Sequence, residues 1–399
     1  MGNSPRFADR MNRLGTETAF DVLARVVALR AQGKDIVSFG IGEPDFDTPR
    51  NIKEAAKRAI DAGKTKYVPS AGIAELRREI AAHVSQTRRI PVTPEEVVVT
   101  PGAKPILFNS IMACLDEGDE IVYPNPGFPI YESVAHWIGA RPIPAPLIES
   151  RNFGLDLDAL RDAIGSRTRM IILNSPNNPT GSVLSIDDLK AVADLAQKHN
   201  LWVLSDEIYS RLVFEGEFHS IATLPGMKER TIILDGFSKT YAMTGWRIGY
   251  GVMPKPLAFH VARIETNLNS CTANFTQWAG IEALTGPQDE PARMAAEFKR
   301  RGQFITAELN KVPGFRCCKP GGAFYVFPNV TGACRRLGLP DSKAFSDFLL
   351  EKAGVAVLAR TCFGKKNVGE SDEYVRFSYA TSMELIREGL ERIKQAVGK

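Results

Sequence analysis

Short apolar runs alternate with longer amphipathic stretches along most of the chain. The apolar runs stand at 97–100, 121–123, 170–173, 202–204 and 231–234, and each has the length of one buried strand. Helix-like stretches follow three of these runs, at 105–114, 128–138 and 186–199. Apolar strands separated by helices are typical of a parallel sheet covered on both faces. The pattern therefore predicts an α/β fold with a mostly parallel sheet, and 248–252 is a candidate for one more strand in either direction.

The order of elements changes beyond residue 286. There the pattern predicts helices at 291–309, 342–352 and 383–396 and short strands at 323–327, 355–358 and 374–377. Such a mixed order is typical of a small α+β domain. Because 399 residues exceed what one hydrophobic core usually organises, two domains are expected.

Composition and charge exclude several classes of protein. The 50 Lys and Arg against 46 Asp and Glu leave a net charge of +4, which is too small to indicate binding to nucleic acid. No apolar run reaches the roughly 18 residues that a membrane helix needs, and no secretory leader opens the sequence. The six cysteines form no disulfide framework and the five histidines no metal-ligand spacing. We therefore expect a cytoplasmic enzyme with no metal and no membrane or nucleic-acid partner.

A lysine and an arginine stand close together directly after the run at 231–234. Lys239 lies where α/β sheets bind ligands, beyond the carboxyl end of a strand. A lysine amine condenses with an aldehyde only when it can be neutral, and a partly desolvated pocket with another cation favours that state. Arg247 would add a fixed charge for a phosphate, and pyridoxal phosphate carries both an aldehyde and a phosphate. An ordinary surface lysine is the alternative interpretation.

Polar residues follow two further apolar runs. Asn178 lies in a turn-rich motif at 174–181, and its amide can donate to the phenolic oxygen of a pyridine ring. Asp206 follows the run at 202–204 and can keep a pyridine nitrogen protonated. Tyr209 would share its face in a helical turn and donate to the ring oxygen. Each motif also has a structural interpretation, an ordinary turn for Asn178 and a helix cap for Asp206.

A glycine-containing turn follows the run at 97–100. Gly102 leads into the helix-like stretch at 105–114, whose N-terminus would present free backbone N–H groups to a phosphate. A simple strand-to-helix turn is the alternative. The four loops together offer a phosphate cradle, donors for a ring oxygen, a carboxylate for a ring nitrogen and a Schiff-base lysine, a combination that chance rarely produces.

The chain resembles the class I aminotransferases of the fold-type-I pyridoxal-phosphate enzymes, and it is most similar to their bacterial aspartate aminotransferase branch. The similarity extends over nearly the whole chain and is carried by motifs at 42–46, 175–181, 205–209 and 239–249.

This resemblance implies a domain organisation. A large pyridoxal-phosphate-binding domain at 47–288 would contain a mostly parallel, seven-stranded sheet, and a smaller α+β domain would follow at 289–399. The N-terminal segment, 1–46, would pack with the small domain. The family habit also implies a homodimer, in which Tyr67 matches a tyrosine that reaches the phosphate in the neighbouring subunit.

The resemblance also assigns roles at the cofactor, pyridoxal 5′-phosphate. Lys239 would form the Schiff base and shuttle protons, and Asp206 would pair with the pyridine nitrogen. Asn178 and Tyr209 would hold the ring oxygen, and Phe128 matches the aromatic residue that stacks on the ring. The residues expected at the phosphate are Gly102, Ala103, Lys104, Ser238 and Arg247. Ser238 is a candidate for the phosphate hydroxyl because Gly236 stands where some relatives have one.

Three residues are expected at the substrate by the same resemblance. Arg376 matches the arginine that grips the α-carboxylate as a bidentate fork. Gly42 would offer its backbone to the same carboxylate, and Asn178 would complete this group.

The activity that the resemblance implies is transamination between an L-amino acid and a 2-oxo acid, with ping-pong kinetics and Lys239 as base and acid. Aspartate or glutamate is the favoured substrate, because Lys104 lies where close relatives bind a side-chain carboxylate. Phe128, Ile41 and Phe46 equally suit a pocket for alanine, branched-chain or aromatic amino acids. A carbon–sulfur lyase and a biosynthetic carbon–carbon bond-forming enzyme are further alternatives, since one scaffold supports several fates of the same cofactor.

Overall fold

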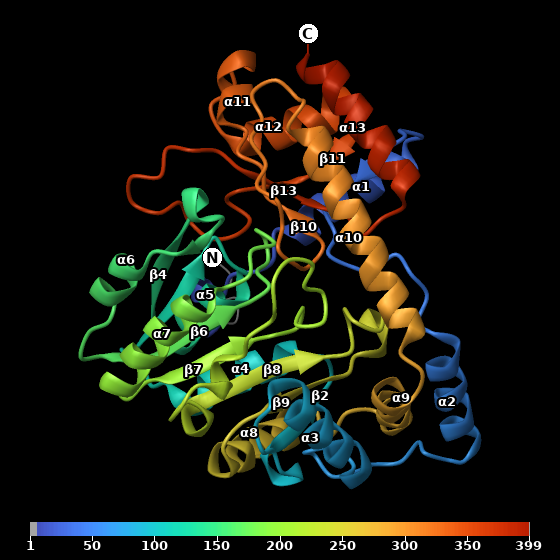
Figure 1. Ribbon diagram of the computed structural model, residues 1–399, viewed down its shortest axis with the longest axis vertical. Helices are drawn as coiled ribbons and strands as arrows, with labels where there is room; N and C mark the ends of the chain where they lie inside the picture. The colour runs from blue at the N-terminus through green and yellow to red at the C-terminus, as the bar shows by residue number, and fades with distance from the viewer. Residues whose placement is uncertain (1–5, 399) are drawn as a thin grey trace.

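The computed structural model describes residues 6–398 and contains one large sheet with a smaller domain beside it (Figure 1). The sheet has eight strands in the order β2-β9-β8-β7-β6-β3-β4-β5. The bounds of its strands are Val97–Thr100 (β2), Glu120–Asn125 (β3), Arg141–Ile148 (β4), Gly154–Leu155 (β5), Thr168–Asn174 (β6), Trp202–Asp206 (β7), Thr231–Gly236 (β8) and Gly249–Val252 (β9). Strands β8, β7, β6, β3 and β4 are parallel neighbours, and β9 runs antiparallel between β2 and β8. The predicted mostly parallel α/β sheet is confirmed.

The sheet has one strand more than the predicted seven. The two-residue β5 pairs antiparallel with β4 at the edge, and its short length gives no apolar run that the sequence could reveal. The apolar runs also miss β4, because Pro142, Pro144 and Pro146 interrupt it. Arg141 donates to Asp119 O on the β3 side, so the alternate proline nitrogens face the outer edge, where proline is tolerated.

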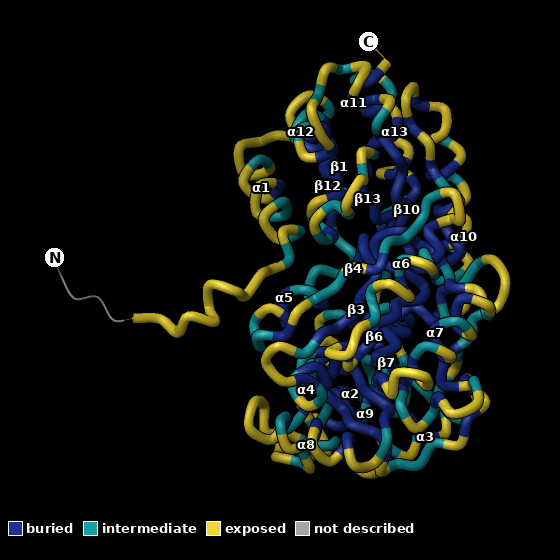
Figure 2. The backbone as a smooth tube through the Cα atoms, turned by 90° about the vertical axis from the view of Figure 1, so that its left-hand side faces the viewer, coloured by how far each residue is buried: buried dark blue, intermediate teal, exposed yellow. Residues whose placement is uncertain are grey.

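Alternate residues of the central strands pack against helices on opposite faces. Leu204 and Ile232 belong to a cluster with α4 (Lys104–Cys114), whereas Val203 packs with α7 (Ile186–Lys198) on the other face. The remaining helices around the sheet are α2 (Arg50–Asp61), α3 (Ala74–Arg88), α5 (Ile130–Ile138), α6 (Leu157–Asp162), α8 (Lys255–Leu268) and α9 (Asn274–Thr285). Figure 2 shows the strands as the buried interior. This two-sided burial explains why the strands are continuous apolar runs.

Within residues 6–398, the smaller domain contains two small sheets and five α-helices. β10 (Tyr325–Val326), β13 (Val375–Ser378) and β12 (Leu358–Ala359) form an antiparallel sheet, and β1 (Val37–Ser38) pairs parallel with β11 (Val355–Ala356). Its helices are α1 (Ala19–Ala31), α10 (Asp289–Leu309), α11 (Thr331–Leu337), α12 (Ser342–Phe348) and α13 (Met383–Val397). The β1 pairing joins the N-terminal segment to this domain, although residues 1–5 of that segment lie outside the described residues.

Two predicted elements of this domain are divided differently in the structure. The predicted strand at 355–358 is two strands that belong to different sheets, since β11 pairs with β1 and β12 pairs with β13. The predicted helix at 342–352 is α-helical only as far as Phe348, the end of α12, and a π-helical turn follows at Leu349–Ala353. No helix within residues 6–398 is long and apolar enough to cross a membrane.

Candidate active site

The loops beyond β2, β6, β7 and β8 meet the smaller domain around a cavity of about 430 Å³. Such crevices beyond the carboxyl ends of strands are where open α/β sheets bind ligands. The predicted site residues that line the cavity are Gly42, Ala103, Lys104, Phe128, Asn178, Asp206, Tyr209, Ser238, Lys239, Arg247 and Arg376. Gly102 adjoins it beside Arg247, and Tyr67 is 88% exposed on the loop between α2 and α3.

Lys239 follows β8 and reaches across the cavity toward the smaller domain. Its Nζ donates to Gly42 O at 2.7 Å and lies 5.8 Å from the centre of the Phe324 ring. Burial lowers the pKa of Lys239 to about 8, Glu43 opposes the shift, and Arg376 adds to it. A neutral amine is therefore accessible near physiological pH, as a Schiff-base lysine needs.

Asp206 ends β7 with its carboxylate turned to the cavity. Tyr131, from α5, donates its hydroxyl to Asp206 Oδ2 at 2.6 Å, and the Ile208 N–H donates to Oδ1 at 3.3 Å. Burial raises the pKa of Asp206 to about 6, and the Tyr131 hydrogen bond limits the rise. Nothing in a single sequence pairs position 131 with 206, so Tyr131 was not predicted.

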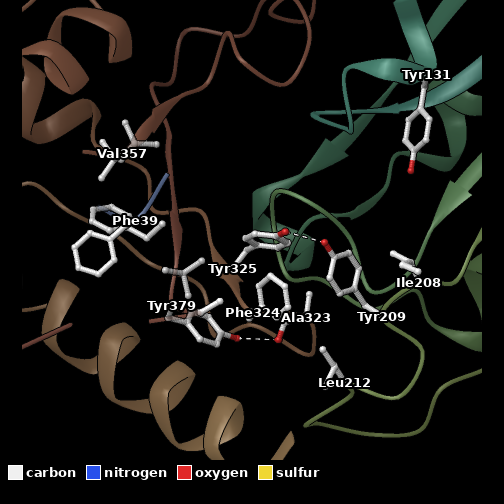
Figure 3. Close-up of a cluster of buried hydrophobic side chains, with 14 of the residues drawn as sticks. Phe39, Tyr131, Ile208, Tyr209, Leu212, Ala323, Phe324, Tyr325, Val357 and Tyr379 are labelled. Carbon is white, nitrogen blue, oxygen red and sulfur yellow. Dashed lines mark hydrogen bonds between the residues drawn. The ribbon is translucent and has the colours of Figure 1, made fainter. Parts of the chain in front are cut away.

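Tyr209 and Asn178 are tied into a polar network around Asp206. The hydroxyls of Tyr209 and Tyr325 form a hydrogen bond of 2.7 Å, shown by a dashed line in Figure 3. Asn174 Oδ1 accepts from the Asn178 N–H at 2.8 Å, while Asn174 Nδ2 donates to Asp206 O at 3.1 Å. Tyr325 and Asn174 are further unpredicted members of the site: Asn174 joins the ends of β6 and β7, and Tyr325 joins the loop after β7 to the smaller domain.

Arg376, on β13, is buried between two aromatic rings. Its guanidinium carbon lies 4.5 Å from the centre of the Tyr325 ring and 4.9 Å from that of Phe363. Its Nη1 donates to Asn178 Oδ1 at 2.9 Å and its Nη2 to Gly40 O at 2.5 Å, but its buried Nε has no hydrogen-bond partner among residues 6–398. Burial lowers the pKa of Arg376. A planar cation held by rings and left with an unpaired donor is prepared for a carboxylate.

The opposite end of the cavity presents backbone N–H groups and a cation. α4 begins at Lys104, directly after Gly102 and Ala103, so its first N–H groups point toward the cavity. Gly102 has φ +87°, and a Cβ there would lie 2.3 Å from Arg247 Nη2. Arg247 is exposed, and it donates to Thr244 O at 2.8 Å and to Pro101 O at 3.3 Å. This end therefore brings together a guanidinium and backbone N–H groups, the donors that a phosphate needs.

The glycine at 236 has a packing reason. A Cβ at Gly236 would lie 3.0 Å from Gly249 Cα on the paired strand β9. A hydroxyl residue is therefore disfavoured at 236, whereas Ser238 lines the cavity and is available.

Phe128 and Lys104 form the wall near the cavity mouth. The Phe128 ring contacts Tyr131 edge to face, with ring centres 5.7 Å apart, and Lys104 Nζ lies 5.4 Å from the centre of the Phe128 ring. Lys104 also forms an ion pair with Glu17, an acid that the sequence analysis did not single out. Within residues 6–398 the structure contains no cluster of His, Cys, Asp and Glu that could hold a metal ion.

Residues 34–393 match the family model described as aminotransferase class I and II. The chain belongs to this family. It is 41% identical over 394 residues, or 98% of each chain, to an Aquifex aeolicus protein named probable aspartate/prephenate aminotransferase. A solved aspartate aminotransferase from Rhizobium meliloti superposes with a TM-score of 0.93 at 36% identity and 99% coverage of both chains. The Thermus thermophilus aspartate aminotransferase with maleate gives 0.91 at 38% identity, covering 98% of this chain and all of that one, 100%.

These comparisons confirm the predicted family, its fold and its activity class. The chain is an aminotransferase, an enzyme of the transaminase type. The similarity covers 98% of the Aquifex aeolicus relative and 99% of the Rhizobium meliloti structure, so it includes every element around the cavity described above.

Proposed function

We propose that this aminotransferase holds pyridoxal 5′-phosphate in the cavity at the carboxyl edge of the sheet and exchanges amino groups there by a ping-pong mechanism. The observation that carries the proposal is that Lys239 lines one cavity together with the carboxylate of Asp206 and the cations of Arg247 and Arg376. When bound, the cofactor supplies an aldehyde for an amine and a ring that accepts electrons.

The residues at the two ends of the cavity fit this cofactor. Arg247, the N–H groups of Gly102, Ala103 and Lys104, and the Ser238 hydroxyl would hold the phosphate. Gly102 lets the Arg247 guanidinium lie against the backbone at the start of α4, because a Cβ at 102 would clash with it.

The middle of the cavity fits a pyridine ring. Asp206, held by Tyr131, would accept the hydrogen bond of the protonated ring nitrogen, and that ion pair would offset the burial of the carboxylate. Tyr209 and Asn178 would donate to the ring oxygen, and Phe128 would lie against the ring face. Each donor is already fixed by a second hydrogen bond, so little reorganisation is needed.

Lys239 would move the proton. Its pKa of about 8 lets the neutral amine take a proton from the substrate Cα as a general base. The resulting ammonium can then donate that proton to a different atom as a general acid. Gly42 O, 2.7 Å from Nζ, would keep the amine beside the Gly42 backbone, where Arg376 and Gly42 would also hold the substrate α-carboxylate. Asn178, which accepts from Arg376 Nη1, would orient that guanidinium.

A dicarboxylic substrate class is proposed, with aspartate as the amino-group donor and 2-oxoglutarate as the acceptor, which becomes glutamate. Lys104 extends into the cavity from the start of α4 and would receive the side-chain carboxylate. The relatives from Aquifex aeolicus and Rhizobium meliloti, which are named aspartate/prephenate and aspartate aminotransferase, support the same substrate class.

We propose a cytoplasmic homodimer. Arg247 is exposed in the single chain and shares a second hollow with Glu43 and Trp246, which a partner subunit would cover. Tyr67, exposed on its loop, would then reach the phosphate site of the partner. All six cysteines are unpaired, which fits a reducing compartment.

Steady-state kinetics test the proposal. With the amino acid and the oxo acid both varied, double-reciprocal plots should give parallel lines, because the first product leaves before the second substrate binds. Intersecting lines, or pyruvate and ammonia formed from cysteine without any oxo acid, would contradict transamination and favour a lyase.

A further inference from the structure

Lys104, the lysine that the proposed function assigns to a substrate carboxylate, already contacts an acidic residue of this chain. Glu17, just before α1, lines the cavity, and its side chain is only 16% exposed. Its carboxylate forms an ion pair with Lys104, whose side chain is 46% exposed. Lys104 is therefore already bound to a carboxylate of its own chain.

The charge of Glu17 acts inside the site as well as at its rim. Burial lowers the pKa values of Lys239 and Arg376, and in both residues the negative charge of Glu17 opposes that shift. The carboxylate thus lies close enough to influence the amine and the substrate-binding fork together. Glu17 is in the position of an anion at the distal end of a bound substrate.

Apolar side chains line the cavity that this ion pair borders. Phe20, Ile41, Leu107, Phe128 and Phe363 line the same cavity. Two carboxylates on one ammonium in such surroundings would leave an uncompensated negative charge, which is costly where water is partly excluded. A substrate with a distal carboxylate therefore has to displace Glu17 from Lys104, whereas a substrate with an apolar side chain can leave the pair in place.

We propose that Glu17 is a specificity-determining residue, which competes with the distal carboxylate of dicarboxylic substrates for Lys104 and so lets the site accept apolar and aromatic amino acids as well. This inference rests on the proposed function, because it assigns a substrate range to the same cavity. The displacement involves the segment before α1, whose exposed chain leads outward from the body of the protein (Figure 2).

The test compares Glu17→Gln with the cofactor-loaded wild-type enzyme. The ratio of kcat/KM for aspartate to that for phenylalanine should rise about tenfold in Glu17→Gln, mainly through a lower KM for aspartate, since the change removes a competitor that acts on binding. Glu54→Gln is the matched control, because Glu54 also pairs with a lysine, Lys57, but does so on the protein surface and not in the cavity. It should leave the ratio within about twofold of wild type.

A double-mutant cycle identifies Lys104 as the group in competition. In a Lys104→Met background, Glu17→Gln should no longer change the ratio, because no ammonium remains for either carboxylate. An unchanged ratio in Glu17→Gln, or the same rise with Lys104→Met present, would overturn the inference.

Ligand binding separates this inference from the proposed function. Maleate, a dicarboxylate that cannot be transaminated, should bind the loaded Glu17→Gln enzyme about tenfold more tightly than wild type, whereas 3-phenylpropanoate should bind both about equally. If the wild-type enzyme transaminates nothing, the proposed function fails, but the maleate comparison still supports or contradicts the role of Glu17.

Discussion

Asp206 and Glu207 are neighbours in the chain and carry the same charge, but they lie in opposite environments. Asp206 faces the cavity, and its carboxylate accepts from the Tyr131 hydroxyl. Glu207 faces away and accepts from Arg88 Nε at 2.9 Å, in a sealed cluster where Arg88 also binds Asp235 at 2.5 Å. The side chains of Arg88 and Glu207 are each 2% exposed.

The difference separates two uses of buried charge. In the sealed cluster Glu207 and Asp235 share the guanidinium of Arg88, so both carboxylates already have a charged partner within the fold. In the cavity, Lys239 and Arg376 donate to backbone carbonyls or an amide, and Asp206 accepts from a phenol. These charged groups have no oppositely charged partner among the hydrogen bonds just described, so a bound ligand can pair with them. Several such groups around one cavity indicate a functional site and not a stabilising ion-pair cluster.

The largest effect is expected from the cavity side. Lys239→Ala should lower kcat about a thousandfold or more, because no other group is placed to move the Cα proton. The midpoint of thermal unfolding of the cofactor-free variant should not fall below that of cofactor-free wild type, because the change removes a buried ammonium. Lys190→Ala, on the exposed face of α7, is the matched control and should keep full activity. Substantial activity in Lys239→Ala would show that another base serves the reaction.

Replacing the carboxylate of Asp206 or of Glu207 by an amide sharpens the comparison. Asp206→Asn should lower kcat about a hundredfold or more, since it removes the preorganised charge at the ring nitrogen. Glu207→Gln should keep kcat within about tenfold but should lower the free energy of unfolding, because Arg88 loses a buried partner. Measured kcat and urea unfolding of both variants decide the matter, and equal losses of kcat would erase the distinction.

The sealed cluster is broken most directly at Arg88. Arg88→Met leaves Glu207 and Asp235 buried together without a cation, and the free energy of unfolding should fall by about 3–5 kcal/mol. Arg376→Met removes an equally buried arginine that pairs with no carboxylate of the cluster, so it should abolish substrate binding at a smaller cost in stability. A larger loss of stability in Arg376→Met than in Arg88→Met would contradict the comparison.

The smallest effect concerns pH. Burial lowers the pKa of Lys239 from 10.5 to about 8, so the cofactor-free folded state binds fewer protons than the unfolded state between these values. The cost of the buried ammonium is therefore fully present below pH 8 and is relieved as pH rises toward 10.5. Cofactor-free Lys239→Met should be more stable than wild type by about 3 kcal/mol at pH 7, and this advantage should be about 2 kcal/mol smaller at pH 10. Urea unfolding at both pH values measures it, and a pH-independent difference would refute the lowered pKa.

The strands around the cavity could be predicted because they are buried on both faces. Continuous apolar runs such as 170–173 and 231–234 end next to Asn178 and Lys239, so strand and ligand loop are visible in one stretch of sequence. β4 was missed because its prolines contradict the apolar pattern, and their tolerance depends on an edge that only the sheet order shows.

The unpredicted site residues share another property, which is that their role depends on long-range contacts. Tyr131 meets Asp206 through the pairing of distant strands, and Tyr325 reaches Tyr209 from the smaller domain. Glu17 has no motif around it and becomes informative only beside Lys104. The same limit applies to Glu207, whose sequence position next to Asp206 gives no sign that it faces the other way.

The central claim is that the cavity transfers an amino group to its cofactor. The most direct test mixes cofactor-loaded enzyme with one amino acid and no oxo acid, and follows the visible absorbance of the cofactor together with the released 2-oxo acid. The account predicts loss of the visible band with about one 2-oxo acid formed per site, fastest with aspartate or glutamate, and neither change in Lys239→Ala. An unchanged spectrum with every amino acid, or ammonia released while the visible band persists, would contradict it.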